Sequence, residues 1–551
     1  MLARPHSSNK QWSALVIALA LVLAAPAFLR CHRWLDGVNW PHDPDYLRNN
    51  GQAQAMLDGD WRHDPILAGE TAWYPPLMAA LIAGAQRITG LPLIEISSQG
   101  GLWFNVAALT MLFAAAWRLL GRWGALLCLS SFLYLLGAGL NSYAEVGLSP
   151  LIEPISFMLG PWCLALVAMR GILDEKAGAK AWLGAGLAAG ICFIGHPSSA
   201  MILALTCALL VASRIVKGSG IIRTLNGLTA YAAGFLVLAS IVLAPLWLAY
   251  GLEARNSGFA WIYEPIALVN VHRSLMGIHP IVLAITVLGI ISALKQRGAT
   301  QLVLLSAFAS ASILFLWSSV SSEFFLLKRA LPIPKLVVPP HHFYYFLKAL
   351  LCFFFAQGAL ALGIRIRDRL SSAQWAQPFL RQASVILQWR AGAGRVLVGI
   401  TLALCFLAFG LRWAMAEDVA FNGIARGAKE PGLLNPYRHI LGTTSPGEVF
   451  LCDDELAFRL IAPAGRKVVA THPLFASPYV DILPRIADRD SLLFLLRDGD
   501  TTRFQELALR YGVTRIALKV GEEEAPHAAF GMRPDYTNDT IALYRWPIQS
   551  R

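Results

Sequence analysis

The sequence predicts a polytopic α-helical membrane protein with a small α/β domain at its C-terminal end. Of its 551 residues, 56% are hydrophobic and only 15% are charged, whereas roughly 25% are charged in an average soluble domain. The hydrophobic residues gather in runs of about 17–22 residues, the length that an α-helix needs to cross a hydrocarbon core of about 30 Å. This pattern excludes an ordinary soluble enzyme.

Eleven apolar runs are predicted to cross the membrane, and because several are short the expected number lies between ten and thirteen. The first run is expected to stay as a membrane helix rather than be cleaved as a signal peptide, because basic residues flank it on both sides and "AFLRCHRW" is a poor cleavage site. The predicted spans are Trp12–Leu29, Gly101–Leu120, Gly124–Leu140, Pro154–Met169, Ala181–Ile194, Ser199–Ala212, Leu228–Tyr250, Ile281–Leu294, Gln301–Trp317, Phe343–Ile364 and Val396–Leu411.

The distribution of charge between the runs predicts the orientation. With the N-terminus in the cytoplasm, the cytoplasmic segments hold eighteen basic residues against three acidic ones, whereas the outside loop 31–100 holds eight acidic residues against four basic ones. This asymmetry follows the positive-inside rule. It also accounts for the net charge of +12 without nucleic acid as a partner. The Arg-rich cytoplasmic loops favour a bacterial inner membrane, with the C-terminal domain in the periplasm.

Two regions are predicted outside the bundle of helices. In the loop 31–100, "PPLMAALIAGAQRITG" is apolar but short and indicates a re-entrant or interfacial helix. The chain is expected to divide into a membrane module, 1–415, and a soluble tail, 416–551. Short β-branched runs and an amphipathic helix at Thr502–Tyr511 give the tail an α/β pattern. Of the eight cysteines only Cys31 and Cys452 are expected outside, so at most one disulfide is expected there.

Polar side chains collect at the predicted outer edge of the membrane, where desolvation is costly and a functional role is the default expectation. Each also has an ordinary interpretation: Asp43-Pro-Asp45 is typical of a turn or helix start, His196 before Pro is typical of a helix cap, and Lys348 can extend to the interface. The candidates are Asp43, Asp45, Glu145, Glu153, His196, His272, Arg273, Lys328, Arg329, Lys335, His341, His342 and Lys348.

These features together resemble the GT-C superfamily of integral-membrane glycosyltransferases. The resemblance rests on "HDPDYLRNNGQAQAMLDGDWRHD…WYPPL" in a long acidic outside loop after the first helix, an acidic residue after the third crossing, and an outside soluble tail. Relatives include oligosaccharyltransferase catalytic subunits, protein mannosyltransferases, and aminoarabinose and arabinofuranosyltransferases. The chain departs from them in three ways. Its tail lacks a WWDYG-type motif, the acid after the third crossing stands alone, and His341-His342-Phe343 replaces an Arg-aromatic pair.

The resemblance implies an inverting transfer of a sugar from a polyprenyl-phosphate donor to a hydroxyl of a glycan, lipid or protein acceptor, in contact with membrane lipids. Asp43 or Asp45 takes the place of the catalytic acid, and Glu145 that of an acid which completes a divalent-cation site in metal-dependent members. Oxygen and imidazole ligands from Asp43, Asp45, Glu145 and His196 suit Mg²⁺ or Mn²⁺.

Elementary chemistry leads to the same assignments. The reaction needs a carboxylate to remove the proton from the acceptor and positive charge on the leaving phosphate. The cations expected on the donor phosphate are Lys328, Arg329, Lys335, His341, His342 and Lys348. Acceptor or loop positioning is expected of Tyr46, Glu70, Tyr74, Glu153, His272 and Arg273.

Two other classes of function are kept. A transporter or flippase of lipid-linked glycans is disfavoured, because internal repeats are absent and the charges gather at one face rather than at the centre of the membrane. A non-catalytic receptor or assembly protein would bind a partner through the tail, for example through Asp453–Glu455 or "THPLFASPYVD".

Overall fold

The computed structural model describes residues 6–41, 44–136, 148–149, 152–174, 178–218, 220–256, 278–323, 338–372, 431–521 and 530–546. The predicted span Val396–Leu411 and the expected boundary at residue 415 lie outside the described residues. So do seven of the candidate site residues, which are Asp43, Glu145, His272, Arg273, Lys328, Arg329 and Lys335.

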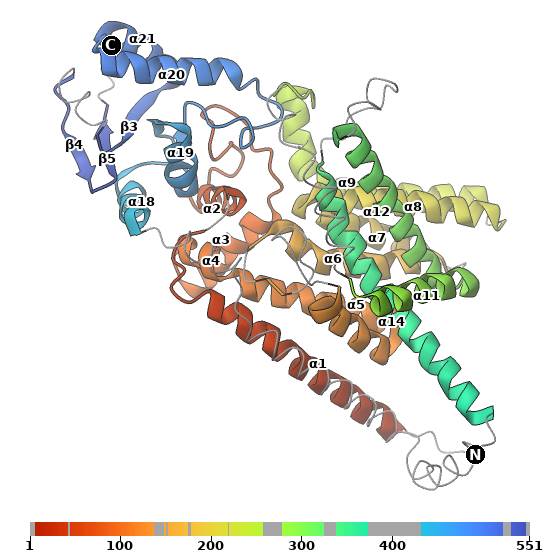
Figure 1. Ribbon diagram of the computed structural model, residues 1–551. Coiled ribbons are helices and arrows are strands. Elements are labelled where there is room, and N and C mark those ends of the chain that lie inside the picture. Colours follow the sequence, from red (N-terminus) through yellow and green to blue (C-terminus); the bar gives the residue numbers. More distant parts are fainter. Residues whose placement is uncertain are drawn as a thin grey trace.

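The described part is mostly helical, which confirms the predicted class (Figure 1). Seven of its helices are long and apolar enough to cross a membrane, and α7 and α11 are shorter apolar helices. The predicted number of eleven is not confirmed. The apolar helices are α1 His6–Trp34, α5 Gly101–Ser130, α6 Pro154–Gly171, α7 Ala179–Gly195, α8 Pro197–Val216, α9 Ile221–Tyr250, α11 Pro280–Gln296, α12 Ala299–Glu323 and α14 Pro340–Ser372.

Three predicted helix boundaries differ from the structure. The two runs Gly101–Leu120 and Gly124–Leu140 are joined in α5, where Gly121 has a φ of 78° and forms a kink, and the π-helical turn η1 Ser131–Leu135 follows. Helix α12 extends to Glu323, and α14 begins at Pro340, so the predicted start at Phe343 is wrong. Proline is well suited to the first helical position, because the amide hydrogen that it lacks has no partner there. His341 and His342 therefore belong to the first turn of α14.

Helix α14 is central to the membrane bundle. It packs against α5, α6, α8, α11 and α12, and its apolar segment from Phe343 to Ala356 is largely buried. The rings of Trp162 in α6 and Phe346 in α14 lie 4.9 Å apart. Polar residues near the start of α14 are therefore held in a densely packed environment.

Three helices follow α1 before the chain re-enters the bundle. They are α2 Pro44–Leu57, α3 Leu77–Thr89 and α4 Leu93–Gln99. The apolar stretch predicted to form a short helix does so in α3, and α3 and α4 meet at an angle of 116°. A break of this kind is typical of a re-entrant pair or a broken span.

The C-terminal region is a small α/β domain, as predicted. It contains α18 Pro431–Thr443, β1 Val449–Leu451, α19 Asp454–Leu456, η4 Ala457–Ile461, η5 Ala462–Ala464, β2 Lys467–Val468, α20 Leu483–Asp498, α21 Thr501–Tyr511, β3 Val513–Lys519, β4 Pro534–Thr537 and β5 Ile541–Arg545. The sheet has the order β2-β1-β3-β5-β4, with β1 parallel to β2 and β3 and with β5 antiparallel to β3 and β4. Cys452 and Cys31 are both buried free thiols, and no disulfide joins them.

Alternate residues of the strands face opposite sides of this sheet. Leu451, Ile516 and Tyr544 pack with α20 and α21 on one face. Phe450 and Leu543 lie on the other face, packed with α18, η4 and η5 and with residues Ile66 and Leu67 of the first loop. The first loop thus contributes to the core of the C-terminal domain.

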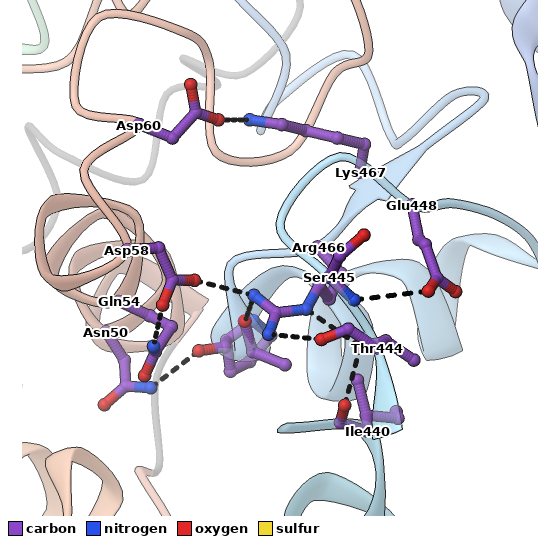
Figure 2. A network of polar contacts seen from close by, with 12 residues as sticks. Asn50, Gln54, Asp58, Asp60, Ile440, Thr444, Ser445, Glu448, Arg466 and Lys467 are labelled. Atoms are coloured by element: carbon purple, nitrogen blue, oxygen red, sulfur yellow. Dashed lines mark hydrogen bonds and ion pairs between the residues drawn. The ribbon is translucent and has the colours of Figure 1, made fainter. Parts of the chain in front are cut away.

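The first loop also extends the sheet beyond β2. Leu67 forms a parallel bridge with Val468, whose amide donates to the Ile66 carbonyl at 2.7 Å. Figure 2 shows the ion pairs beside this bridge: Arg466 Nη1 lies 2.8 Å from Asp58 Oδ2, and Lys467 Nζ lies 2.9 Å from Asp60 Oδ2. We call the contact between residues 50–70 and the C-terminal domain the junction.

Candidate active site

The N-terminal turn of α2 presents a carboxylate and a guanidinium on the same helix face. Asp45 and Arg48 are three residues apart, a spacing that brings side chains together on a helix, and Arg48 Nη1 donates to Asp45 Oδ1 at 3.2 Å. The Arg48 side chain is 6% exposed and that of Asp45 is 45% exposed. A buried cation therefore orients a carboxylate that stays open to solvent.

Three aromatic rings surround the Arg48 guanidinium. Its central carbon lies 4.7 Å from the ring centroid of Tyr74, 5.3 Å from that of Trp73 and 5.6 Å from that of Phe475. These distances are in the range of cation–π contacts. Gln52 Nε2 donates to the Tyr74 carbonyl at 3.0 Å and fixes the Trp73-Tyr74 segment against α2. The stretch "WYPPL" is thus packed on the helix that carries Asp45.

Tyr74 connects α2 with the membrane helices. Desolvation raises the pKa of its hydroxyl above the ordinary value, the negative charge of Asp45 raises it further, Arg48 lowers it, and Glu153 contributes a smaller increase. Glu153 precedes the first residue of α6, and its Oε2 accepts hydrogen bonds from Ser156 Oγ at 3.0 Å and from the Tyr345 hydroxyl at 3.3 Å. Asp45 and Glu153 thus lie close enough to Tyr74 to raise its pKa, and Tyr345 of α14 donates to Glu153; we call these four side chains the polar layer.

Lys348 continues this layer into α14. It lies one helical turn after Tyr345, is 2% exposed, and places Nζ 5.4 Å from the ring centroid of Tyr344. Burial of an ammonium group among apolar side chains is costly, and a retained buried cation near a membrane edge is typical of a functional residue.

The predicted histidines also meet. The ring centroids of His196 and His342 are 4.7 Å apart, and those of His341 and His342 are 4.4 Å apart. His196 caps α8: its Nδ1 accepts from the Ser198 amide and lies 2.7 Å from Ser198 Oγ. Burial, together with the charge of His341, lowers the pKa of His196 to about 3. His196 is therefore neutral near pH 7 and contributes no positive charge there.

Two other predicted site residues lie in structural contacts. Tyr46 is 6% exposed in the buried part of α2. Glu70 forms an ion pair with Arg485 of the C-terminal domain and accepts from the Tyr250 hydroxyl of α9 at 2.9 Å. Glu70 therefore ties the first loop to α9 and α20.

The described residues do not by themselves make a cation site. No three His, Cys, Asp or Glu side chains within the described ranges converge to hold a metal ion. Of the four predicted ligands, Asp43 and Glu145 lie outside those ranges, Asp45 is paired with Arg48, and Nδ1 of His196 is engaged with Ser198.

The structure adds three residues to the candidate site. Arg48 and Tyr345 have a local signal, since each stands three residues from a selected residue. Phe475 lies in the stretch "THPLFASPYVD", which the sequence suggests only as a partner-binding segment, and no local pattern pairs it with Arg48, 427 positions earlier.

Comparison with known proteins gives the fold. Neither a family model nor a curated protein matches the chain. Two crystal structures of ArnT from Cupriavidus metallidurans, one apo and one bound to undecaprenyl phosphate, align with it at a TM-score of 0.51. The identities are 15% and 14%, the alignments cover 98% and 97% of this chain, and both cover 98% of ArnT. The chain has a GT-C fold.

The archaeal oligosaccharyltransferase AglB from Archaeoglobus fulgidus, in complex with an inhibitory peptide and a dolichol-phosphate, aligns less closely. Its TM-score is 0.49 at 11% identity, over 95% of this chain and 71% of AglB. The ArnT alignments span nearly the full length of both chains, so the GT-C resemblance inferred from the sequence is confirmed for the fold, including the C-terminal domain.

Proposed function

We propose that the chain is an inverting glycosyltransferase that moves a sugar from a polyprenyl-phosphate donor to an acceptor hydroxyl. The observation that carries the proposal is the polar layer together with its two neighbouring cations. Arg48 pairs with Asp45 beside Tyr74 in the first loop, and Lys348 lies one turn after Tyr345, which donates to Glu153. A glycosyltransferase with a lipid donor needs both a carboxylate and a cation where membrane helices meet an aqueous domain. The GT-C fold supports this class of chemistry.

The reaction divides between the two ends of the layer. A carboxylate, Asp45 or its neighbour Asp43, takes the proton of the acceptor hydroxyl. The acceptor oxygen then attacks the anomeric carbon from the face opposite the phosphate, and the bond between that carbon and the phosphate oxygen breaks. The phosphate leaves with the bonding electrons, and Lys348 stabilises its added charge.

The lipid carrier explains why the cation is on a membrane helix. Its polyprenyl chain stays in the bilayer, so its phosphate arrives at the membrane edge, where Lys348 lies near the start of α14. Undecaprenyl phosphate is bound in one ArnT structure and dolichol-phosphate in one AglB structure, which supports a donor of this class. We place the layer at the periplasmic face of a bacterial inner membrane, from the positive-inside count.

The decisive experiment compares Asp43→Asn and Asp45→Asn in a strain that lacks the chain. Mass spectrometry of envelope lipids, glycans and proteins identifies the sugar that wild-type complementation restores. We expect one of the two variants to reduce this modification at least about a hundredfold, because a base no longer accepts the proton. Asp36→Asn, in the same loop and exposed, serves as the control and should complement fully.

A second measurement separates transfer from transport. Purified full-length protein in liposomes is given undecaprenyl-phosphate-linked sugars extracted from the host membranes, and both movement across the bilayer and release of undecaprenyl phosphate are followed. Release that depends on an acceptor supports a transferase. Full complementation by both Asn variants, or movement of the donor without release, would contradict the proposal.

A further inference from the structure

The C-terminal domain supplies one wall of the cage around Arg48. Trp73 and Tyr74 belong to the same loop as Arg48, but Phe475 comes from the opposite end of the chain. Arg48 Nε is buried and has no hydrogen-bond partner among the described residues. Its position against Asp45 therefore depends strongly on the rings that enclose it.

Other residues of the C-terminal domain fix the position of Phe475. Its ring stacks on Phe458 of η4 with centroids 3.7 Å apart and an interplanar angle of 22°, and its amide donates to the His472 carbonyl at 2.9 Å. Phe475 thus presents a fixed ring face rather than a mobile side chain.

The segment that carries Phe475, residues 472–480, is also fastened to the end of α9 and to residues 251–256, which follow that helix. Asn256 is 7% exposed, and its Nδ2 donates to the carbonyls of Pro473 at 2.9 Å and Ser477 at 3.3 Å. The Arg255 amide donates to the Pro478 carbonyl at 2.9 Å, and Tyr479 stacks on Tyr250 at 5.8 Å. We call residues 472–480 the strap, since it is attached to the C-terminal domain, to α9 and to the cage.

From this arrangement we infer that Phe475 is a positioning residue, which sets the catalytic geometry of Asp45 through Arg48. The strap makes the C-terminal domain part of the reaction centre, because a displacement of that domain moves Phe475 and leaves the guanidinium free to turn from the carboxylate. Phe475 touches neither the donor nor the acceptor in this role. The inference rests on the proposed transferase function, with Asp45 in its catalytic layer.

The central variant is Phe475→Leu, which keeps the apolar volume and removes the aromatic face. Volume-conserving apolar changes are tolerated best in a packed environment, so we expect the melting temperature to stay close to that of the wild type. We expect kcat to fall about tenfold with KM for the lipid donor nearly unchanged, because the loss of a desolvated cation–π contact affects the alignment of Asp45. Phe475→Tyr should restore the rate. Phe494→Leu, an exposed position on α20, is the matched control and should match the wild type.

A double-mutant cycle tests whether Phe475 acts through Arg48. Arg48→Lys keeps the positive charge but loses the planar group that stacks on the rings. If the two residues act as one unit, Phe475→Leu should reduce kcat about tenfold in the wild type and leave it nearly unchanged in Arg48→Lys. Additive losses, or a wild-type kcat in Phe475→Leu, would overturn the inference.

Hydrogen exchange in the full-length protein provides a readout that does not depend on sugar transfer. We expect the amides of residues 46–52 in α2 to exchange faster in Phe475→Leu and at the wild-type rate in Phe494→Leu. Unchanged exchange in Phe475→Leu overturns the positioning role. If the exchange responds while the wild-type protein transfers no sugar, the proposed function has failed and the contact between the strap and α2 stands.

Discussion

Lys348 combines near-complete burial with a formal charge, at 2% exposure in a helix packed on five others. A buried charge contributes little to the stability of the fold, because the free-energy cost of its desolvation offsets the favourable interaction with its partners. Its neighbour Tyr345 has a different task, since the Tyr345 hydroxyl donates to Glu153. Under the proposed function, one turn of α14 therefore carries both the cation for the donor phosphate and the hydrogen-bond donor that holds Glu153.

For Lys348→Met, which keeps most of the apolar stem, we expect activity to suffer far more than stability. Loss of a charge that stabilises the leaving phosphate should reduce kcat about 10²–10³-fold, while the melting temperature changes by only a few degrees. The measurement is release of undecaprenyl phosphate beside a thermal-unfolding scan. A large loss of stability with retained turnover would assign Lys348 to structure alone.

At the level of single residues, the sequence predicts which polar residues are candidates for the site better than it predicts the residues that they contact. Asp45, Glu153, His196 and Lys348 stand out because each is a polar group near the predicted outer edge of the membrane. Their contacts to Tyr345 or Phe475 are absent from any local pattern, since those contacts form only when α6, α14 and the C-terminal domain assemble.

Among the elements, α2 is fitted closely to the C-terminal domain. An added Cβ at Gly51 would lie 2.0 Å from the carbonyl oxygen of Ala462 in η5, so only glycine allows the helix to approach the C-terminal domain this closely. Asn50 on the same helix donates to the Pro463 carbonyl at 2.7 Å and accepts from Ser97 Oγ at 2.8 Å. The position of Asp45 and Arg48 depends on this docking.

Gly51→Ala should therefore separate α2 from η5. We expect a loss of about 1–3 kcal/mol in the free energy of unfolding, the usual consequence of overpacking, together with reduced transfer. Gly84→Ala is the matched control, because Gly84 lies within α3 and nothing surrounds its added Cβ within 4 Å. Alanine there should stabilise the protein by about 0.5–1 kcal/mol. Thermal unfolding of both variants checks the sign, and equal losses would argue against a specific contact.

The elements that the sequence predicts best are those with a clear local period. The amphipathic helix expected at Thr502–Tyr511 is α21, Thr501–Tyr511, and the β-branched run before Lys519 is β3. Helix ends are less well predicted. Hydropathy alone predicts a start at Phe343 and leaves His341 and His342 in a loop, whereas Pro340 starts the helix before them.

The whole molecule is joined across its length by the junction. The charge count predicts that the loop 31–100 and the tail lie on the same side of the membrane, and in the structure they are in direct contact. Arg466 is 3% exposed and bonds Asp58, Thr444 Oγ1 and two carbonyls. No sequence pattern pairs Asp58 with Arg466, because 408 positions separate them.

The junction has a predictable response to acid, because two of its aspartates are shifted in opposite directions. Burial raises the pKa of Asp60, but hydrogen bonds and charges from Lys467 and His63 outweigh that effect and hold it below 3.8. Burial raises the pKa of Asp64 above 3.8, although backbone hydrogen bonds from Leu67 and Ile66 oppose the increase. The ionised Asp60 therefore stabilises the folded protein above pH 3.8, whereas the ionised Asp64 costs stability above its own raised pKa.

Asp60→Asn isolates the first contribution, because Asp64 is common to both proteins and cancels in the difference. The quantity measured is the melting temperature of the wild type minus that of Asp60→Asn. We expect this difference to be positive and constant from about pH 5.5 to 4.5. It should then shrink as the pH falls through the lowered pKa of Asp60 to about pH 3. The sign follows from linkage: a carboxyl with a depressed folded-state pKa binds its proton more readily after unfolding, so acid favours the unfolded chain. Thermal scans of the full-length protein in detergent at matched ionic strength measure the difference. A difference that grows on acidification, or one that stays constant to pH 3, would show that the Asp60–Lys467 pair does not hold the first loop on the C-terminal domain.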